Sequence, residues 1–231
     1  MSSLIVAGVD SKAARYAVEH WHYSKCLPIG RVVRHGVWED HRFVGVVVYG
    51  RGANSNINTY FNMEHGQVCE LARVAFREHQ HPVSQIVAES LRLLKVENPG
   101  MRIIISYADP AQGHLGTIYQ ALNWIFTGTS AMVVKYYFDG KWVHDRNFNG
   151  LTFGRDTKKH RYPKKDLPVR SYPAKFRYAW PLDRPARKQL EQIALPYPGI
   201  DELAEEVSRA RRRTTGAEGQ VQTLHSALQV D

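Results

Sequence analysis

Two stretches of the chain repeat apolar residues at the period of a helix. The first lies between Pro82 and Pro99, and its apolar positions are Val83, Ile86, Val87, Leu91 and Leu94. The second ends at Gly128, and its apolar positions are Leu115, Ile118, Tyr119, Leu122 and Ile125. Each spacing places the apolar side chains on one face, so both stretches are predicted to be helices that cover a core.

Runs of β-branched and aromatic residues predict strands. Two antiparallel hairpins are predicted, one from residues 32–39 and 43–51, the other from residues 132–138 and 141–145. The almost entirely apolar run 101–107 is typical of a strand covered on both faces. Further strands are predicted at residues 4–9 and 67–76, and further helices at 12–21 and 201–213. This order of elements predicts an α/β fold with a mixed, mostly antiparallel central sheet flanked by helices.

Composition narrows the classes of protein. The 231 residues are 43% hydrophobic and 23% charged, which is ordinary for a soluble globular protein. The apolar runs are far shorter than the roughly 20 residues that a membrane span needs, and the N-terminus lacks the basic region of a signal peptide. Cys26 and Cys69 form no CxxC pair and are expected to be small buried side chains. We therefore expect a cytoplasmic protein with one main core and no membrane partner.

The positive charge is concentrated in one part of the chain. Residues 151–188 contain 12 Lys and Arg against three Asp, a net charge of +9 that equals the net charge of the whole chain. Aromatic residues are interleaved with them, namely Tyr162, Tyr172, Phe176, Tyr178 and Trp180. Cations that neutralise phosphates and aromatic rings that stack on bases are typical of a nucleic-acid surface. The alternative is a solvated basic segment without a specific partner.

These patterns predict three parts. Residues 1–150 are expected to form the main core, and residues 151–195 a basic, aromatic and proline-rich extension that packs on the core and binds nucleic acid. Residues 196–231 are expected to form a charged helix and a flexible tail. The oligomeric state is not predicted.

Several polar residues lie where they could carry chemistry. His22-Tyr23-Ser24 follows a helix and could converge on a ligand, or could instead anchor its loop. His20 and His22 are two residues apart and do not share a helix face, so they are a poor pair of metal ligands. Asp109 ends the apolar strand at residues 101–107 and could accept a proton, or could instead satisfy backbone donors ahead of the following proline.

Further side chains could act in a site or have a simpler structural role. Tyr119 lies on an apolar helix face, where packing in the core is the simpler role. Glu70 and Arg73 are predicted on opposite faces of a strand, so that at most one of them points into a given site. Arg73 suits an anionic donor, a phosphate or an ordinary ion pair. His114 could bind a substrate or hydrogen-bond at the start of its helix.

These residues belong to motifs that resemble a known family. The motifs are His22-Tyr23-Ser24, residues 70–74, Ser106-Tyr107-Ala108-Asp109, residues 113–121 and Lys159-His160-Arg161-Tyr162. Over residues 15–180 the chain resembles the Mom DNA-modification proteins of bacteriophages, which are similar to the GNAT superfamily of acyltransferases. The resemblance implies a GNAT-like fold and a transferase that converts adenine N6 in double-stranded phage DNA to its carbamoylmethyl derivative, which protects that DNA from host restriction.

The resemblance also implies roles for individual residues. The implied catalytic residues are His22, Tyr23, Asp109 and Tyr119. Residues expected to bind the substrate are Ser24, Arg73, Ser106 and His114. Residues expected to bind DNA are Lys158, Lys159, Arg161, Tyr162, Lys164 and Lys165. In this hypothesis Asp109 accepts the N6 proton, Tyr23 borders the extruded adenine, Tyr119 donates a proton, and His22 relays protons or binds a metal.

The group donor stays open at this point. GNAT members hold the pyrophosphate of acetyl-CoA with a glycine-containing loop, but the corresponding residues 77–84 contain no glycine, and Pro82 removes a backbone donor. An aminoacyl-tRNA, in particular glycyl-tRNA, is the alternative donor. Iron is a candidate metal, but the sequence pairs His20 and His22 with no carboxylate motif of the kind that binds iron. Two rival functions are a GNAT acyltransferase for a small amine or protein and a non-catalytic nucleic-acid-binding protein.

Overall fold

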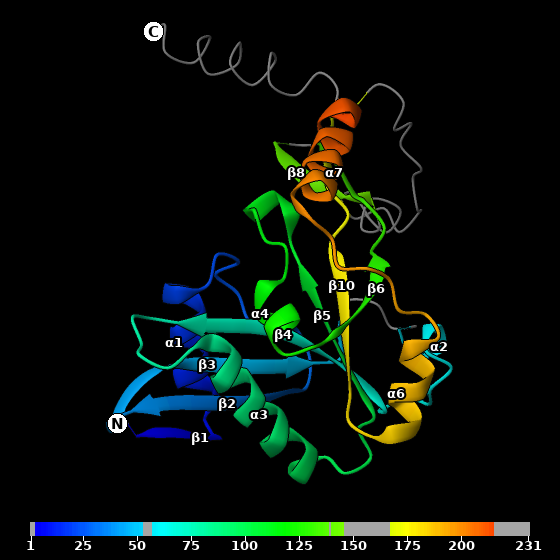
Figure 1. Cartoon of the computed structure of the whole chain (residues 1–231). Coiled ribbons are helices and arrows are strands. Elements are labelled where there is room, and N and C mark those ends of the chain that lie inside the picture. Colours follow the sequence, from blue (N-terminus) through cyan, green and yellow to red (C-terminus); the bar gives the residue numbers. More distant parts are fainter. Residues whose placement is uncertain (1–2, 53–56, 139, 146–166, 215–231) are drawn as a thin grey trace, which may run out of the picture. The chain divides into compact units, whose positions relative to one another are not determined.

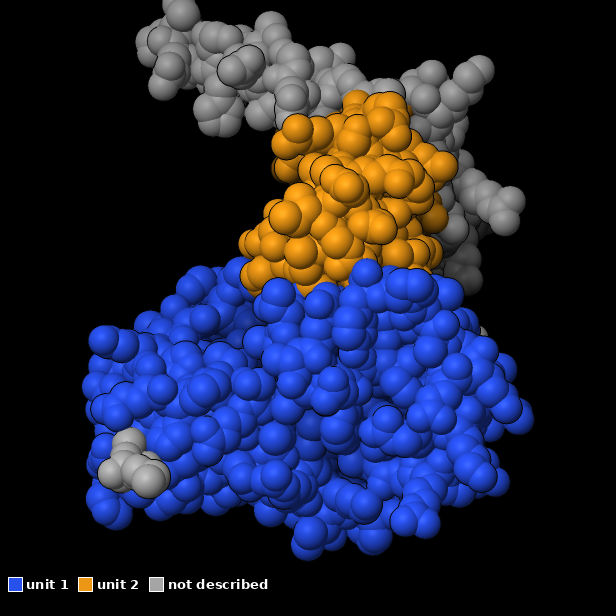
Figure 2. All heavy atoms as spheres, in the orientation of Figure 1, with its two compact units in different colours: residues 1–108, 116–128, 177–197 blue, residues 109–115, 129–176, 198–231 orange. Residues whose placement is uncertain are grey.

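The structure is a computed structural model that describes residues 3–52, 57–138, 140–145 and 167–214 (Figure 1). The chain folds as two compact units, which Figure 2 distinguishes by colour. The first unit contains residues 1–108, 116–128 and 177–197. The second contains residues 109–115, 129–176 and 198–231. In the described ranges, no helix is both long and apolar enough to cross a membrane.

The first unit is built on a seven-stranded sheet. Its strands in spatial order are β1 (Leu4–Gly8), β2 (Val32–Glu39), β3 (Arg42–Gly50), β4 (Val68–Phe76), β5 (Ile103–Ala108), β10 (Phe176–Pro181) and β6 (Ile125–Thr129). The first four strands pair antiparallel, whereas β4 and β5 pair parallel. The predicted mixed, mostly antiparallel sheet is therefore confirmed, and so is the hairpin formed by β2 and β3.

Helices cover both faces of this sheet (Figure 1). Helix α1 (Ser11–Trp21) begins where the Asp10 carboxylate accepts the Ala13 N–H, and it packs on Val46 and Val48 of β3. Helix α3 (Val83–Glu97) covers the opposite face, where its Ser90 bonds the hydroxyl of Tyr49. The remaining helices of this unit are α2 (Ile57–Tyr60), α4 (Thr117–Ala121) and α6 (Arg184–Glu191).

The second unit contains a smaller antiparallel sheet in the order β8 (Lys141–His144), β7 (Val133–Phe138) and β9 (Val169–Tyr172). The pairing of β7 with β8 confirms the second predicted hairpin. Helix α7 (Ile200–Arg213) confirms the predicted charged helix, and Thr214 at its end accepts the backbone N–H of Ser171 in β9. A short 3-10 helix, η1 (Pro110–Gln112), completes the described part of this unit.

The prediction of one long helix through residues 115–125 is wrong. Only α4, five residues long, forms there. Asn123 adopts a left-handed backbone conformation that ends the helical turn, and Ile125 begins β6. The apolar residues of this stretch therefore repeat at a helical period while they belong to a short helix and a strand.

The basic segment contributes to the main sheet. Strand β10 lies between β5 and β6, and its Phe176 and Tyr178 are buried. These two rings are therefore core residues rather than a stacking surface for bases. The residues expected to bind DNA, from Lys158 to Lys165, lie outside the described residues, so their role and the predicted extension at 151–195 stay predictions.

Candidate functional site

Strands β4 and β5 diverge in the middle of the seven-stranded sheet. The two strands pair from Val68 with Ile103 to Glu70 with Ile105, after which β4 continues along β3 and β5 runs on to Ala108. Beyond the paired region, the hydroxyl of Ser106 spans the two strands and lies 2.8 Å from the carbonyl oxygen of Leu71. Polar side chains at this point face the divergence of two parallel strands, which is where α/β folds commonly bind ligands.

Ser106 also contacts the predicted proton donor. The hydroxyl of Tyr119, on α4, lies 2.7 Å from the Ser106 hydroxyl. A serine has one hydroxyl hydrogen and the Leu71 carbonyl can only accept, so Ser106 donates to Leu71 and accepts from Tyr119. Burial raises the pKa of Tyr119 to about 12, with the neighbouring Tyr23 adding to the rise. Tyr119 is therefore a neutral, buried donor whose hydrogen points at Ser106.

Gly116 sets how closely α4 approaches the sheet. Its backbone has a φ of +84°, and an added Cβ would lie 2.4 Å from the Tyr178 ring of β10. Any other residue would be strained and would collide with this buried ring. Gly116 therefore allows α4 to bring Tyr119 against Tyr178, where the two ring centroids are 5.3 Å apart.

A β-bulge in β4 corrects the predicted orientation of Glu70 and Arg73. Tyr49 and Val48 are consecutive in β3, but they pair with Leu71 and Arg73, so Ala72 is an extra residue in β4. The bulge reverses the alternation of side chains beyond it. Glu70 and Arg73 therefore lie on the same face of the sheet, and the prediction that they lie on opposite faces is wrong.

Arg73 connects β4 with the loop that follows α1. Its Nε donates to the carbonyl oxygen of Cys26 at 3.0 Å. In the same loop the Ser24 backbone N–H donates to Nδ1 of His22 at 3.0 Å, so Nδ1 is an acceptor and the ring hydrogen lies on Nε2. The His22 and Tyr23 rings stack at 4.4 Å between centroids, and Tyr23 is 49% exposed. The loop is thus anchored, as one interpretation predicted, and it also presents an aromatic ring to solvent.

Six predicted site residues belong to the first unit: His22, Tyr23, Ser24, Arg73, Ser106 and Tyr119. Asp109 and His114 belong to the second unit. There the Asp109 carboxylate accepts the Ala111 N–H at 3.0 Å and pairs with Lys175 Nζ at 2.8 Å. Asp109 therefore caps the 3-10 helix η1, as the simpler interpretation predicted, and its catalytic role stays a prediction.

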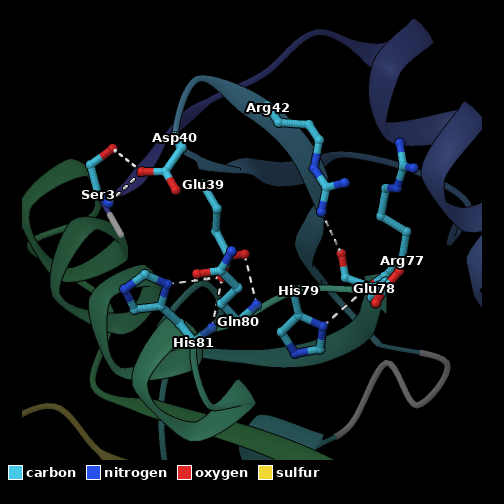
Figure 3. A network of polar contacts seen from close by, with 9 residues as sticks. All are labelled: Ser3, Glu39, Asp40, Arg42, Arg77, Glu78, His79, Gln80 and His81. Atoms are coloured by element: carbon cyan, nitrogen blue, oxygen red, sulfur yellow. Dashed lines mark hydrogen bonds and ion pairs between the residues drawn. The ribbon is translucent and has the colours of Figure 1, made fainter. Parts of the chain in front are cut away.

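Glu39 is a functional candidate that the sequence did not indicate. It ends β2, is 3% exposed, and accepts the backbone N–H groups of Gln80 and His81 at 2.7 and 2.8 Å (Figure 3). The His81 ring adds a third contact at 2.9 Å. Burial alone raises the pKa of Glu39, but these hydrogen bonds outweigh burial and hold its pKa below the ordinary value. The only sequence signal is an acid at the end of a strand, which is too common to indicate such a contact.

The Glu39 contacts bear on the expected cofactors. The amides of Gln80 and His81 lie just before α3, in the segment that would hold the pyrophosphate of an acyl-CoA, and a protein carboxylate already satisfies them. Two anions do not share one pair of amides, so this segment does not fit the CoA pyrophosphate. For iron, the described residues contain no group of three or more His, Cys, Asp or Glu that could hold a metal ion.

Sheet order and helix placement define a mixed α/β protein whose mostly antiparallel sheet is covered by helices on both faces. The profile of the Mom protein family matches residues 3–199, and the chain belongs to this family. It is 26% identical over 202 residues to the methylcarbamoylase Mom of Escherichia phage Mu, a match that covers 84% of this chain and 83% of that protein.

Solved structures show distant likenesses. An N-acyl amino acid synthase from uncultured soil microbes aligns with a TM-score of 0.45 and 10% identity, over 84% of this chain and 96% of that one. A Bacillus subtilis acetyltransferase, solved in complex with CoA, aligns with a TM-score of 0.44 and 13% identity, over 79% of this chain and 100% of that one.

Proposed function

We propose that this chain is a transferase that converts adenine N6 in double-stranded phage DNA to the carbamoylmethyl derivative and so protects the DNA from restriction. The observation that carries the proposal is the family match over residues 3–199, together with the similarity to a phage methylcarbamoylase. The exposed ring of Tyr23, which stacks on the His22 ring, suits a flipped base. Adenine N6 is inaccessible inside a stacked duplex, so the base has to leave the stack before it can react.

The side chains of the first unit suit binding and proton transfer. In our proposal Tyr23 stacks on the extruded adenine, and the protonated Nε2 of His22 contributes a donor. Tyr119 stays neutral at physiological pH and donates to the developing oxyanion after its hydrogen turns away from Ser106. Acceptance of the N6 proton by Asp109, a residue of the second unit, stays a separate prediction, and it requires this carboxylate to release Lys175.

The donor we propose is the glycyl ester of a tRNA. The carbamoylmethyl group contains a nitrogen atom, which a glycyl group supplies and an acetyl group does not. In the first step N6 attacks the ester carbonyl, the C–O bond to the tRNA breaks, and the proton that N6 loses passes through the accepting base to the departing tRNA oxygen, which leaves as a hydroxyl group. The Glu39 contacts support this donor over an acyl-CoA because they fill the amides ahead of α3.

The glycyl adenine formed in this way is an isomer of the product. Its free amine can attack C6 of the ring through a five-membered intermediate, after which the bond from C6 to the original N6 breaks. The glycine nitrogen becomes the new N6, the original N6 becomes the carboxamide nitrogen, and no atom is gained or lost. Tight positioning of amine and ring would favour this intramolecular step.

For the test, bacteria that express the chain are supplied with either nitrogen-labelled glycine or carbon-labelled acetate. The nucleosides of their DNA are then analysed by mass spectrometry. We expect a carbamoylmethyl adenine that carries the glycine nitrogen on C6, so that fragmentation releases unlabelled ammonia from the carboxamide. If the modified adenine contains label from acetate but none from glycine, the glycyl donor is overturned. If the ammonia released from the carboxamide carries the glycine label, the rearrangement is overturned. DNA without modified adenine would overturn the function in favour of an acyltransferase for other amines or a non-catalytic binding protein.

A further inference from the structure

The loop after α1 has a packed base and an exposed tip. Leu27 packs against the core cluster under α1, and Pro28 sits over Gly50 of β3, where an added Cβ would be 3.6 Å from the proline ring. Arg73 holds the carbonyl oxygen of Cys26 at 3.0 Å. The residues up to Pro28 are thus fixed on the sheet, and the next residue projects from a rigid base.

That next residue is Ile29, and it is fully exposed, at 101% of its reference area. Gly30 follows with a φ of +96°, a left-handed conformation that turns the chain back toward β2. Relative to a buried isoleucine, a fully exposed one forgoes the free energy that burial of its apolar surface would release. At the tip of a fixed loop, this side chain is available for contact with an apolar surface.

Cations lie on both sides of this tip along the chain. Lys25 and Arg31 are both exposed, and Lys25 adopts a left-handed backbone conformation that brings its Nζ 3.0 Å from the His20 carbonyl oxygen. Tyr23, the ring proposed to border the extruded adenine, belongs to the same loop. An apolar residue between two cations fits double-stranded DNA, in which stacked bases lie between two phosphate backbones.

We propose that Ile29 is a wedge that enters the base stack at the position left by the extruded adenine, with Lys25 and Arg31 on the adjacent phosphates. The inference rests on the proposed function, because a wedge is useful only to a protein that extrudes a base. Isoleucine is one of the apolar side chains that DNA-bending proteins insert between base steps. Ile29 stabilises the open duplex, and Tyr23 receives the base.

The test uses Ile29→Ala, with Val96→Ala as the matched control. Val96 is a β-branched residue on α3 that is 79% exposed, so both variants remove exposed apolar atoms from the first unit. The probe is a duplex of defined sequence with a single abasic site, compared with the same duplex intact. We expect the wild type and Val96→Ala to prefer the abasic duplex by about tenfold, and Ile29→Ala to lose that preference. Ile29→Leu should restore it.

A second readout separates the wedge from the proposed function. In cells, Ile29→Ala should lower the amount of carbamoylmethyl adenine about tenfold, whereas Val96→Ala should not. Modified DNA at the wild-type level from Ile29→Ala, or an unchanged preference for the abasic duplex, overturns the wedge and leaves the function standing. If cells that express the wild-type protein contain no modified adenine, the proposed function is overturned. If Ile29→Ala converts a dimer to a monomer in sedimentation, Ile29 is a contact between copies, and the wedge is also overturned.

Discussion

Tyr119 illustrates how single atoms constrain the chemistry of the site. Its hydroxyl hydrogen is directed at Ser106, because the Ser106 hydrogen is used by the Leu71 carbonyl. The pKa of Tyr119 is about 12 because the ring is buried. The phenol therefore stays protonated from pH 5 to pH 9, and any pH dependence of the reaction in that interval has to come from other groups.

At the same scale, Ser106→Ala and Tyr119→Phe should have different effects. Ser106→Ala leaves the Tyr119 hydroxyl buried without its acceptor, so we expect the free energy of unfolding to fall by about 1–3 kcal/mol, as measured by urea denaturation. Tyr119→Phe removes the hydroxyl, and because Ser106 keeps its bond to Leu71, a loss of less than about 1.5 kcal/mol is expected.

The same tyrosine variant tests the proposed chemistry. If Tyr119 is the proton donor, Tyr119→Phe should lower the amount of modified adenine about a hundredfold, a change within the usual range for one acid catalyst. Modification at the wild-type level by a folded Tyr119→Phe protein would assign the tyrosine to packing alone, which is the simpler role that its apolar helix face indicates.

At the scale of elements, Glu39 joins the end of β2 to the segment before α3. The contact relies on a carboxylate whose pKa lies below its ordinary value of 4.5. A lowered pKa means that the folded state favours the charged form. The resulting stability is present above pH 4.5 and is lost as the pH falls through the lower value in the folded state.

Glu39→Gln is therefore expected to destabilise the protein at pH 7 by about 1–3 kcal/mol, because the amide accepts with only one oxygen. The difference from the wild type should narrow as the pH falls below 4.5, which thermal unfolding across a pH series measures. A difference that stays constant down to pH 3 would mean that the charge of Glu39 contributes nothing. Glu89→Gln, on the exposed face of α3, is a matched control and should change little.

The bulge in β4 has a structural consequence at the same scale. One extra residue, Ala72, moves Arg73 to the face where α1 packs, and there it holds the loop that carries His22, Tyr23 and Ile29. Without the bulge, the Arg73 side chain would lie on the opposite face of the sheet. The conformation of the loop therefore depends on a local irregularity in a strand that lies further along the chain.

For the whole molecule, the net charge of +9 predicts DNA binding that weakens steeply with salt. Reversal of Lys158, Lys159 and Lys164 to Glu should reduce the slope of log affinity against log salt by about 0.9 for each phosphate that the protein no longer neutralises. Reversal of Arg211, Arg212 and Arg213 in α7 changes the net charge equally and serves as the control. Equal reductions in both triple variants, measured by fluorescence anisotropy, would show that overall charge rather than the basic segment binds DNA.

Local patterns were enough to predict several elements. Helix α3, the hairpin of β2 and β3, and the buried strand β5 form where short-range periodicity and turn residues indicate them. The same reasoning failed at residues 115–125, because a helical spacing of apolar residues also satisfies a short helix followed by a strand. The candidate residues His22 and Tyr119 were found through motifs, but their hydrogen-bond partners were not.

The sequence by itself determined the mixed α/β class, the family and most of the local elements, because periodicity and motifs are properties of neighbouring residues. Only the tertiary structure decided that β10 enters the sheet beside β5, that Glu39 fills amides 41 and 42 residues further along, and that Arg73 and Glu70 share a face. These features depend on pairings between distant segments. Such pairings are selected by the packing of the whole core, and no local pattern encodes them.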